Sequence, residues 1–444
     1  MYDMEVQINR LGINGEGIFN IDNGVDKGKV AFVDFALPEE IVDVDIIKSN
    51  SKYCRCKLNK IITTSKDRIK PRCKYFGKCG GCDIQHFSNE LQIKFKEKKI
   101  LDVVSKIDNN IDCVDIIRKN DFGYRNKMVF PFAYVDGKII VGMFEKNSHN
   151  IVNVDKCWIA SENINNILMV TKKYFDDNSK IFDDIKDKIE LKYLVVREMQ
   201  GQIIVSIVCT AKYDFIEYYN ILKSAYCNIG LSIVVNKSND EILAGEYISE
   251  YGNVIIKANE FGIDYDVDIM SFVQVNNDIK KELYSKILSF LNEDGVVIDA
   301  FSGAGLLSAI VAKKCKKVVG IEINKFASSN ADKLTKSNNI LNLTNICGDA
   351  NLMLKDICKK YKNSTLILDP ARQGCGNGIN EFLSENVDYL PKQIMYVSCN
   401  PATLSRDINC IKNNYAITYT CGYDMFPNTK HIETLVCLQR QAER

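Results

Sequence analysis

The first sixty residues alternate short runs of apolar and β-branched side chains with glycine-rich stretches. Three such runs are Met4–Ile8, Lys29–Phe35 and Ile41–Ile47, and glycines are frequent between them. Short strands bounded by glycines are typical of small all-β folds. The pattern therefore predicts a small β-barrel over residues 1–60.

A helical pattern and then a second β-rich pattern follow. Apolar side chains recur at Leu91, Phe95, Ile100 and Val104, with lysines on the opposite face, which predicts a helix within residues 84–116. Alternating segments then predict four strands: Met128–Val135, Ile139–Phe144, Tyr193–Met199 and Gln202–Cys209. We assign residues 61–270 to a β-rich central domain, whose helix is a candidate to dock on the domain that follows.

The last part of the chain alternates strand and helix patterns, which predicts an α/β fold with a parallel sheet. An apolar strand ends in Asp299, and Gly303 and Gly305 follow it before a helix. Glycines in such a turn let the backbone approach a nucleotide-like ligand. A second strand ends in Glu322, seventeen residues after Gly305, where a carboxylate can accept hydrogen bonds from ribose hydroxyls.

The glycine turn lacks the third glycine of the dinucleotide-binding pattern. This favours S-adenosylmethionine over NAD as the ligand. It predicts an α/β Rossmann-like, S-adenosylmethionine-dependent methyltransferase domain over residues 271–444. A further strand ends just before Asp369, which places another acid at the same crevice.

Composition indicates a globular protein that buries substantial cores. The chain has 444 residues, of which 46% are hydrophobic, and a formal net charge of +1. Its first residues show no basic start followed by an apolar run, and no apolar stretch approaches the roughly 20 residues that span a bilayer. We therefore expect a cytoplasmic protein without a membrane partner.

Charge is distributed unevenly along the N-terminal part. Residues 1–45 contain ten acidic and three basic side chains, which argues against direct RNA contact by the barrel. Residues 52–78 contain ten basic side chains and one acid, interleaved with Tyr53, Tyr75 and Phe76. A basic run is often only a solvated face, but interleaved aromatic rings favour a nucleic-acid surface.

Seventeen cysteines without a secretory signal indicate reduced thiols, metal ligation or catalysis rather than a disulfide framework. Cys73, Cys79 and Cys82 lie within ten residues and are separated by glycines near the last pair. Zinc prefers paired Cys-x2-Cys knuckles, whereas this spacing suits a polynuclear soft-metal site. Cys157 is the candidate for the fourth ligand. Cys54, Cys56 and Cys113 have no partner in this pattern.

One cysteine lies where chemistry is expected. Cys399 follows the apolar run that ends in Ser398, and Asn400-Pro401 forces a turn before a helical pattern. A thiol at the carboxyl end of a strand faces the ligand crevice of an α/β fold, and the N-terminus of a following helix favours the thiolate. The alternative is a buried cysteine that only packs.

Three separated motifs carry a resemblance to a known family. They are Leu-Asp369-Pro-Ala-Arg-Gln-Gly, Tyr396-Val-Ser-Cys-Asn-Pro-Ala-Thr and His431-Ile-Glu433-Thr. In this order they resemble the signature of the RNA (uracil-5-)-methyltransferases. The resemblance implies that Cys399 is the nucleophile, which adds to carbon 6 of uracil, and that Glu433 is the base, which removes the hydrogen from carbon 5.

The same resemblance implies the cofactor contacts and the nearby cations. Gln274, Phe301, Glu322 and Asp369 match the positions at which the family binds S-adenosylmethionine. Arg372 and Arg406 are candidates to neutralise phosphate or enolate charge.

The N-terminal part resembles one branch of this family. Gly15-Glu-Gly-Ile-Phe and the following apolar run resemble the TRAM domain, an OB-like RNA-binding barrel. In that branch a Cys-x5-Cys-x2-Cys spacing with a distant cysteine holds a 4Fe-4S cluster, which implies cluster ligation by Cys73, Cys79, Cys82 and Cys157. The barrel and the cluster together favour the enzymes that modify 23S ribosomal RNA over those that modify transfer RNA.

The sequence thus predicts methylation of carbon 5 of an unpaired or flipped uridine in RNA, through a covalent cysteine-uracil intermediate. A tRNA uracil-5-methyltransferase and a non-catalytic iron-sulfur RNA-binding protein are the alternatives. A DNA cytosine-5 enzyme would carry its cysteine in a Pro-Cys pair, whereas Cys399 follows Ser398. No DNA partner is therefore expected.

Overall fold

The N-terminal residues form a six-stranded, curled sheet. The computed structural model describes residues 4–180, 182, 189–238, 242 and 245–441. The strand order is β1-β5-β6-β4-β3-β2. The strands are β1 (Met4–Gln7), β2 (Arg10–Leu11), β3 (Gly17–Asn20), β4 (Val30–Val33), β5 (Ile41–Ser49) and β6 (Tyr53–Thr63). Alternate residues of β6 point inward, so Cys54 and Cys56 are buried in the core of this barrel.

A loop segment that carries three of the predicted ligand cysteines links the barrel to α1 (Asn89–Val104). The hydroxyl of Ser88 caps this helix by accepting the N–H of Leu91 at 3.1 Å. The helix is shorter than the 84–116 segment that the sequence predicted. A turn at residues 108–111 and the strand β7 (Asp115–Ile117) follow it, because Asp and Asn favour turns.

The central sheet has the order β15-β14-β13-β12-β8-β9. Its strands are β8 (Lys127–Val135), β9 (Lys138–Val141), β12 (Leu191–Met199), β13 (Gln202–Cys209), β14 (Ile229–Val235) and β15 (Glu246–Gly252). The helices α2 (Glu162–Asp177) and α4 (Ile216–Ala225) pack on one face. Side chains of β12 alternate between the two faces of the sheet. Leu194 lies on the helix-covered face, and Val195 lies on the opposite face, where it packs in a core shared with the C-terminal domain.

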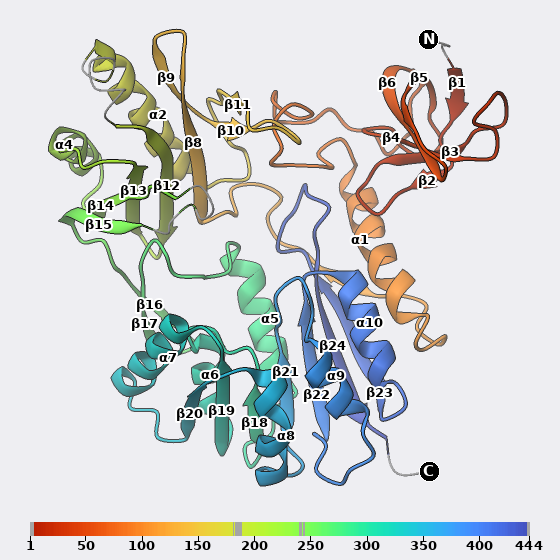
Figure 1. Cartoon of the computed structure of the whole chain (residues 1–444), viewed down its shortest axis with the longest axis vertical. Helices are drawn as coiled ribbons and strands as arrows, with labels where there is room; N and C mark the ends of the chain where they lie inside the picture. The colour runs from red at the N-terminus through yellow and green to blue at the C-terminus, as the bar shows by residue number, and fades with distance from the viewer. Residues whose placement is uncertain (1–3, 181, 183–188, 239–241, 243–244, 442–444) are drawn as a thin grey trace.

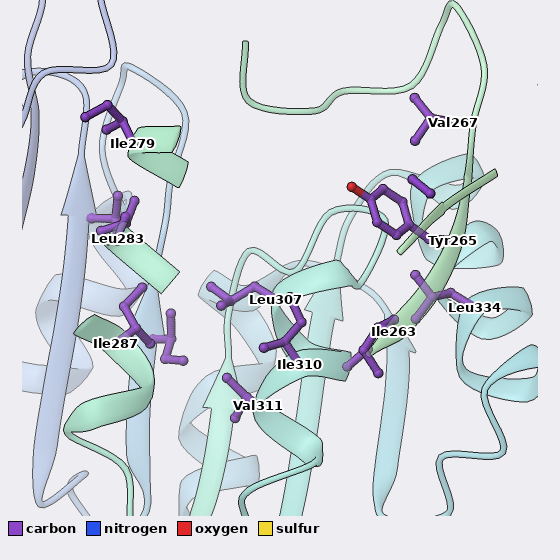
Figure 2. Packing of buried hydrophobic residues seen from close by; sticks show 14 of the residues in the cluster. Ile263, Tyr265, Val267, Ile279, Leu283, Ile287, Leu307, Ile310, Val311 and Leu334 are labelled. Carbon is purple, nitrogen blue, oxygen red and sulfur yellow. The ribbon is translucent and has the colours of Figure 1, made fainter. Parts of the chain in front are cut away.

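Two short hairpins flank the central sheet. The first pairs β10 (Met143–Phe144) with β11 (Ile151–Val152), and the second pairs β16 (Ile256–Glu260) with β17 (Ile263–Val267). The second hairpin packs on the C-terminal domain. Figure 2 shows Ile263 and Tyr265 of β17 beside Leu307 and Ile310, with residues of α5 on the far side.

The C-terminal domain is an eight-stranded sheet between two layers of helices (Figure 1). Its order is β20-β19-β18-β21-β22-β24-β23-β7, with β7 contributed from before the central domain. The strands are β18 (Val296–Asp299), β19 (Lys317–Glu322), β20 (Leu343–Cys347), β21 (Thr365–Leu368), β22 (Gln393–Ser398), β23 (Tyr415–Tyr423) and β24 (Glu433–Arg440). The first five are parallel, and β24 is antiparallel to both neighbours. This is the α/β methyltransferase fold that the sequence predicted.

The two helical layers contact opposite faces of this sheet. One layer contains α5 (Asn277–Ser289), α6 (Leu306–Ala312) and α7 (Lys325–Ser337). The other contains α1, α8 (Ala350–Lys360), α9 (Asn377–Ser384) and α10 (Pro401–Ile411). Strand order reverses between β18 and β21, and such a reversal opens a crevice at the carboxyl ends of the strands. None of the described helices is both long enough and apolar enough to cross a bilayer.

Candidate active site

A cavity of about 1030 Å³ lies at this crevice, between the C-terminal domain and the β16–β17 hairpin. Five of the six residues that the sequence predicted for catalysis and cofactor binding line it, namely Gln274, Phe301, Asp369, Cys399 and Glu433. They come from the segment before α5, the glycine turn, the ends of β21 and β22, and the start of β24. Folding thus brings together positions that are far apart in the sequence.

Cys399 lies between the end of β22 and the start of α10. The side chain of Asn400 accepts the N–H of Ala402 at 3.1 Å and so caps α10, while its Nδ2 donates to the carbonyl of Arg372 at 3.1 Å. Pro401 occupies the first turn of the helix, where its missing N–H has no cost. The predicted turn therefore holds the half-buried thiol at the cavity wall.

Glu433 is the neighbour of Cys399 across the sheet. The antiparallel register ends with Ser398 opposite Thr434. Cys399 and Glu433 adjoin that pair on their two chain segments, both line the cavity, and the charge of Glu433 acts on the Cys399 thiol. Glu433 is only 6% exposed. A thiol and a carboxyl group thus face the same cavity side by side.

Three carboxyl groups line the cavity and have raised pKa values: Asp299 and Glu433 are buried, and Asp369 is partly buried. Loss of water raises the pKa of Glu433 to about 8, with Asp369 adding to the increase and Arg372 opposing it. Burial followed by the charge of Asp299 raises the pKa of Asp369 to about 7. Burial raises the pKa of Asp299 to about 6, although the Ser308 hydroxyl donates to it at 2.6 Å. Glu433 therefore exchanges its proton near neutral pH, as a general base should.

The electrostatics of Cys399 differ from the expectation that the site ionises the thiol. Burial, and then the charge of Glu433, raises the pKa of Cys399 above its usual value, while Arg372 lowers it. The imidazole of His431 is neutral, because burial and Arg372 lower its pKa to about 4. Helix α10 alone does not outweigh burial.

The two candidate arginines lie in different places. Arg372 lines the cavity beside Cys399. Arg406 is outside the cavity lining and donates to Asp407 at 2.8 Å and to the carbonyl of Gln373 at 2.8 Å. Of the two, only Arg372 is positioned to meet charge on a bound substrate.

Glu322 lies behind the glycine turn and outside the cavity lining. Its Oε2 accepts the N–H of Gly303 at 2.9 Å, and its Oε1 accepts the N–H of Asn324 at 2.7 Å. A carboxylate has about four acceptor sites, so two such bonds leave capacity for hydroxyl groups of a ligand. Its place at the end of β19 remains compatible with ribose binding.

Sequence reasoning missed the wall of the cavity opposite the strands. Tyr265, Lys280 and Tyr284 line that wall, and Oε2 of Glu260 accepts the Tyr265 hydroxyl at 2.9 Å and lies 2.7 Å from the Lys280 ammonium. The alternation Ile-Asp-Tyr-Asp-Val in β17 signals a half-buried strand. It does not reveal which domain the strand covers.

The four predicted ligand cysteines also come together. Cys73, Cys79, Cys82 and Cys157 line one small pocket of about 20 Å³, whose other lining residues include Tyr75, Phe76, Met143 and Trp158. We call this the cysteine pocket. Burial raises the pKa of Cys79 to about 11 and raises those of Cys82 and Cys157, with the other thiols adding to the increase. The N–H of Gly81 donates to Sγ of Cys79 at 3.4 Å.

Four soft sulfur donors in an apolar pocket, one of them accepting a backbone N–H, fit an iron-sulfur cluster by donor chemistry. Within the described part of the chain, no three His, Cys, Asp or Glu side chains are grouped to hold one metal ion.

Comparison with known proteins agrees with this arrangement. Residues 88–441 match the family model described as tRNA (Uracil-5-)-methyltransferase, and residues 3–58 match the TRAM domain model. An uncharacterized RNA methyltransferase of Clostridium tetani is 32% identical over 97% of this chain and 95% of its own length. One of Clostridium acetobutylicum is 32% identical over 99% of this chain and 97% of its own length.

One solved structure shares the fold along nearly the whole chain. It is the Pyrococcus abyssi tRNA (uracil-54, C5)-methyltransferase in complex with S-adenosyl-L-homocysteine. Its TM-score is 0.75 at 22% identity, and the match covers 98% of this chain and 100% of that one. A transfer RNA enzyme can therefore have the complete arrangement, N-terminal barrel included. The barrel by itself does not separate the ribosomal branch from the transfer RNA branch.

Proposed function

Because the chain belongs to the tRNA (uracil-5-)-methyltransferase family and begins with a TRAM domain, we propose that it methylates carbon 5 of a uridine in RNA, with S-adenosylmethionine as methyl donor. The observation that carries the proposal is that Cys399 and Glu433 line one cavity, at the adjoining ends of the neighbouring strands β22 and β24. Carbon 5 of uracil is a weak nucleophile, so its methylation needs covalent activation.

The cofactor is assigned to the part of the cavity beside the glycine turn. Gln274, Phe301 and Asp369 would contact the cofactor. Glu322 would accept hydrogen bonds from its ribose hydroxyls. When bound, S-adenosylmethionine supplies an electrophilic methyl group on its sulfonium sulfur. The apolar side chain of Leu306, which also lines the cavity, can contribute packing or backbone contacts only.

In the proposed mechanism, the Cys399 thiolate adds to carbon 6 of the uracil and pushes electron density onto carbon 5, which takes up the methyl group. Glu433 then removes the proton from carbon 5. The electron pair of that C–H bond re-forms the double bond between carbons 5 and 6 and expels the Cys399 thiolate. Arg372 is the candidate to stabilise the negative charge of the enolate. A base whose pKa is about 8 is suited to this proton transfer.

Tritium release from RNA labelled at carbon 5 of uracil tests the reaction. The intact protein with S-adenosylmethionine should release tritium, and Cys399→Ala should release none while still binding RNA. Glu433→Gln should accumulate a covalent protein-RNA adduct that survives denaturant, since adduct formation precedes the step that Glu433 performs. Release by Cys399→Ala would exclude the nucleophile. A cofactor-replete protein that binds RNA without release would instead be the non-catalytic RNA-binding alternative.

We take 23S ribosomal RNA as the expected substrate, on the resemblance of the cysteine spacing to that branch. Transfer RNA is the second candidate, because the fold match to a transfer RNA enzyme extends over the barrel. Mapping 5-methyluridine in ribosomal and transfer RNA from cells that lack the protein decides between them. The class of RNA that loses the modification is the substrate.

A cluster of basic side chains and aromatic rings next to the cysteine pocket supports an RNA partner. The guanidinium of Arg72 lies 3.9 Å from the ring centre of Trp158 and 5.1 Å from that of Phe122. The ammonium of Lys156 lies 5.0 Å from the Trp158 ring. Exposed basic groups beside aromatic rings suit unpaired nucleotides, which combine phosphate charge with stacking bases.

We further propose that Cys73, Cys79, Cys82 and Cys157 hold a 4Fe-4S cluster. The support is their convergence on one apolar pocket and their sulfur-only chemistry. Protein purified without oxygen should contain iron and sulfide at about four each per chain and absorb broadly in the visible range. Stoichiometric zinc in place of iron would exclude the cluster.

A further inference from the structure

The loop between β23 and β24, residues 424–432, ends directly at Glu433. Its own backbone includes Asn428 in the left-handed region, with φ +67°. Asparagine adopts this conformation more readily than most residues, so hydrogen bonds rather than strain hold the loop. The groups that fix this loop therefore also set the direction in which the Glu433 side chain points.

The first connection comes from the residue after Cys82. The N–H groups of Asp83 and Ile84 both donate to the carbonyl of Asn428, each at 3.1 Å. In return, the N–H of Lys430 donates to Oδ2 of Asp83 at 3.2 Å. Three hydrogen bonds thus join the peptide that carries one ligand cysteine to the middle of the β23–β24 loop.

The second connection comes from the segment after Cys157. The N–H of Gly123 donates to the carbonyl of Trp158, and the N–H of Arg125 donates to the carbonyl of Ile159, both at 2.9 Å. Between these residues, the buried hydroxyl of Tyr124 donates to the carbonyl of Pro427 at 3.0 Å. The two halves of the cysteine pocket therefore reach neighbouring residues of the same loop.

The start of the loop is fixed independently of the cysteines. The fully buried carboxylate of Asp424 lies 2.6 Å from the ammonium of Lys96, which is also fully buried, on α1. Arg118 lies 3.5 Å from the other oxygen of Asp424. The middle of the loop is held from α1 as well, since Gln92 accepts the N–H of Asn428 at 3.1 Å and Lys99 donates to the carbonyl of Lys430 at 2.6 Å. The bonds of Asp83 and Tyr124 add the connection to the cysteine segments.

We propose that the cysteine pocket, when its four thiols bind one metal group, positions the base Glu433 through Asp83 and Tyr124. Ligation fixes the backbone at Cys82 and Cys157 relative to each other, whereas four separate thiols do not. Asp83 and Tyr124 are positioning residues, because they act on Glu433 through the loop. This inference rests on the proposed function and on the proposed cluster.

Variants of the two positioning residues test the inference. Asp83→Ala and Tyr124→Phe should slow tritium release by roughly tenfold or more, because a displacement of ~1 Å can cost on the order of 100-fold. Both should accumulate part of the covalent adduct that Glu433→Gln accumulates, with an unchanged KM for S-adenosylmethionine. Asp83→Asn keeps a carbonyl acceptor for the N–H of Lys430 and should restore release. If tritium release fell and no covalent adduct accumulated, these residues would have a structural role only.

Asp155→Ala is the matched control. Asp155 lies two residues before Cys157, is exposed, and pairs with Lys74 at 2.5 Å. This variant should release tritium at the rate of the unchanged protein and accumulate no adduct. If it accumulated as much adduct as Asp83→Ala, a general disturbance of the cysteine segments would replace the inference.

Hydrogen exchange provides a readout apart from activity. Removal of the metal by a chelator should increase exchange in residues 424–432 and 118–125, and leave β19 and β20 unchanged. Equal exchange in loaded and chelated protein would overturn the inference. If Glu433→Gln itself gives no adduct, the proposed function fails instead, and the exchange result then stands apart from it.

Discussion

At the residue scale, Glu433 places an ionisable carboxyl group in a buried position, where its charged form is unfavourable. Glu433 is almost fully buried and its pKa is about 8, far above the value of about 4.3 for an exposed glutamate. Each tenfold change in proton affinity corresponds to about 1.4 kcal/mol. The ionised carboxylate of Glu433 therefore destabilises the folded protein, so its proposed role as a base opposes stability.

Glu433→Gln should stabilise the protein in a pH-dependent way. A carboxyl group whose pKa is raised on folding binds protons more tightly in the folded state, so its effect on stability worsens as pH rises from about 4.3 to about 8. The variant should come closest to the unchanged protein below about pH 4 and have a higher Tm near pH 9. Thermal unfolding across this range measures the difference, and exposed Glu293→Gln should show no such trend. A constant difference at all pH values would contradict the buried charge.

The sequence predicted the identities in this site better than their electrostatics. Cys399 and Glu433 stand in local motifs, and their motifs meet because β22 and β24 are neighbours. The raised pKa of Cys399 could not be predicted, because it depends on burial and on Glu433, which lies 34 positions further along the chain (433 − 399). The position of Glu322 behind the glycine turn is likewise a property of the folded chain.

At the element scale, the turn after β18 depends on two glycines in different ways. Both have positive φ, +55° at Gly303 and +83° at Gly305. A Cβ at Gly305 would lie 2.7 Å from that of Ala331 on α7, whereas one at Gly303 would meet no atom within 4 Å. The first glycine is needed for the turn alone, and the second also for the approach of α6 to α7.

Gly305→Ala should therefore be more destabilising than Gly303→Ala. Each substitution carries the cost of a left-handed conformation, about 1–2 kcal/mol. Gly305→Ala adds the cost of overpacking against α7, about 1–3 kcal/mol. Urea unfolding of the two variants compares them directly. Equal destabilisation would show that α7 moves aside without cost.

Elements were predictable where the apolar pattern is strong. Four strands of the C-terminal domain, β18, β19, β21 and β22, and the turn after Cys399 are present as predicted. The helix within residues 84–116 is shorter than predicted, because β7 finds a partner in β23, and pairing with a strand so distant in sequence leaves no local signal. The destination of β17 was missed for the same reason.

At the scale of the whole molecule, the barrel is joined to the cysteine segment by a buried ion pair. The side chain of Glu40 is fully buried, and its Oε1 lies 2.5 Å from Nε of Arg68. Arg68 also donates to the carbonyl of Phe35 at 2.6 Å. A second pair, Lys146 with Asp34 at 3.1 Å, is partly exposed at the same junction.

Arg68→Met should destabilise the protein strongly, by about 3–5 kcal/mol, because it leaves the charge of Glu40 buried and unpaired. Lys146→Met removes a partly exposed pair and should cost no more than about 1 kcal/mol. Adding Glu40→Gln to Arg68→Met should recover part of the loss. Urea unfolding measures all three, and similar losses for Arg68→Met and Lys146→Met would contradict the importance of burial.

The domain ranges proposed from the sequence meet one complication at this scale. Residues 89–117 fall within the segment 61–270, yet α1 and β7 pack with the C-terminal sheet. The sequence analysis named the helix as a candidate to dock on the C-terminal domain, whereas the three residues of β7 give no such signal. The assignment of β7 required the long-range contacts of the folded chain.

The place of β7 at the edge of the C-terminal sheet has a consequence for how the protein is made. During synthesis, β7 is made before the central domain and β23 after it. The two strands can therefore pair only once the whole central domain has been synthesised. An excised piece that begins at residue 271 would leave β23 as a bare, unpaired edge. An unpaired edge strand can pair with another chain and cause aggregation. The smallest catalytic fragment that does not aggregate should therefore begin before α1.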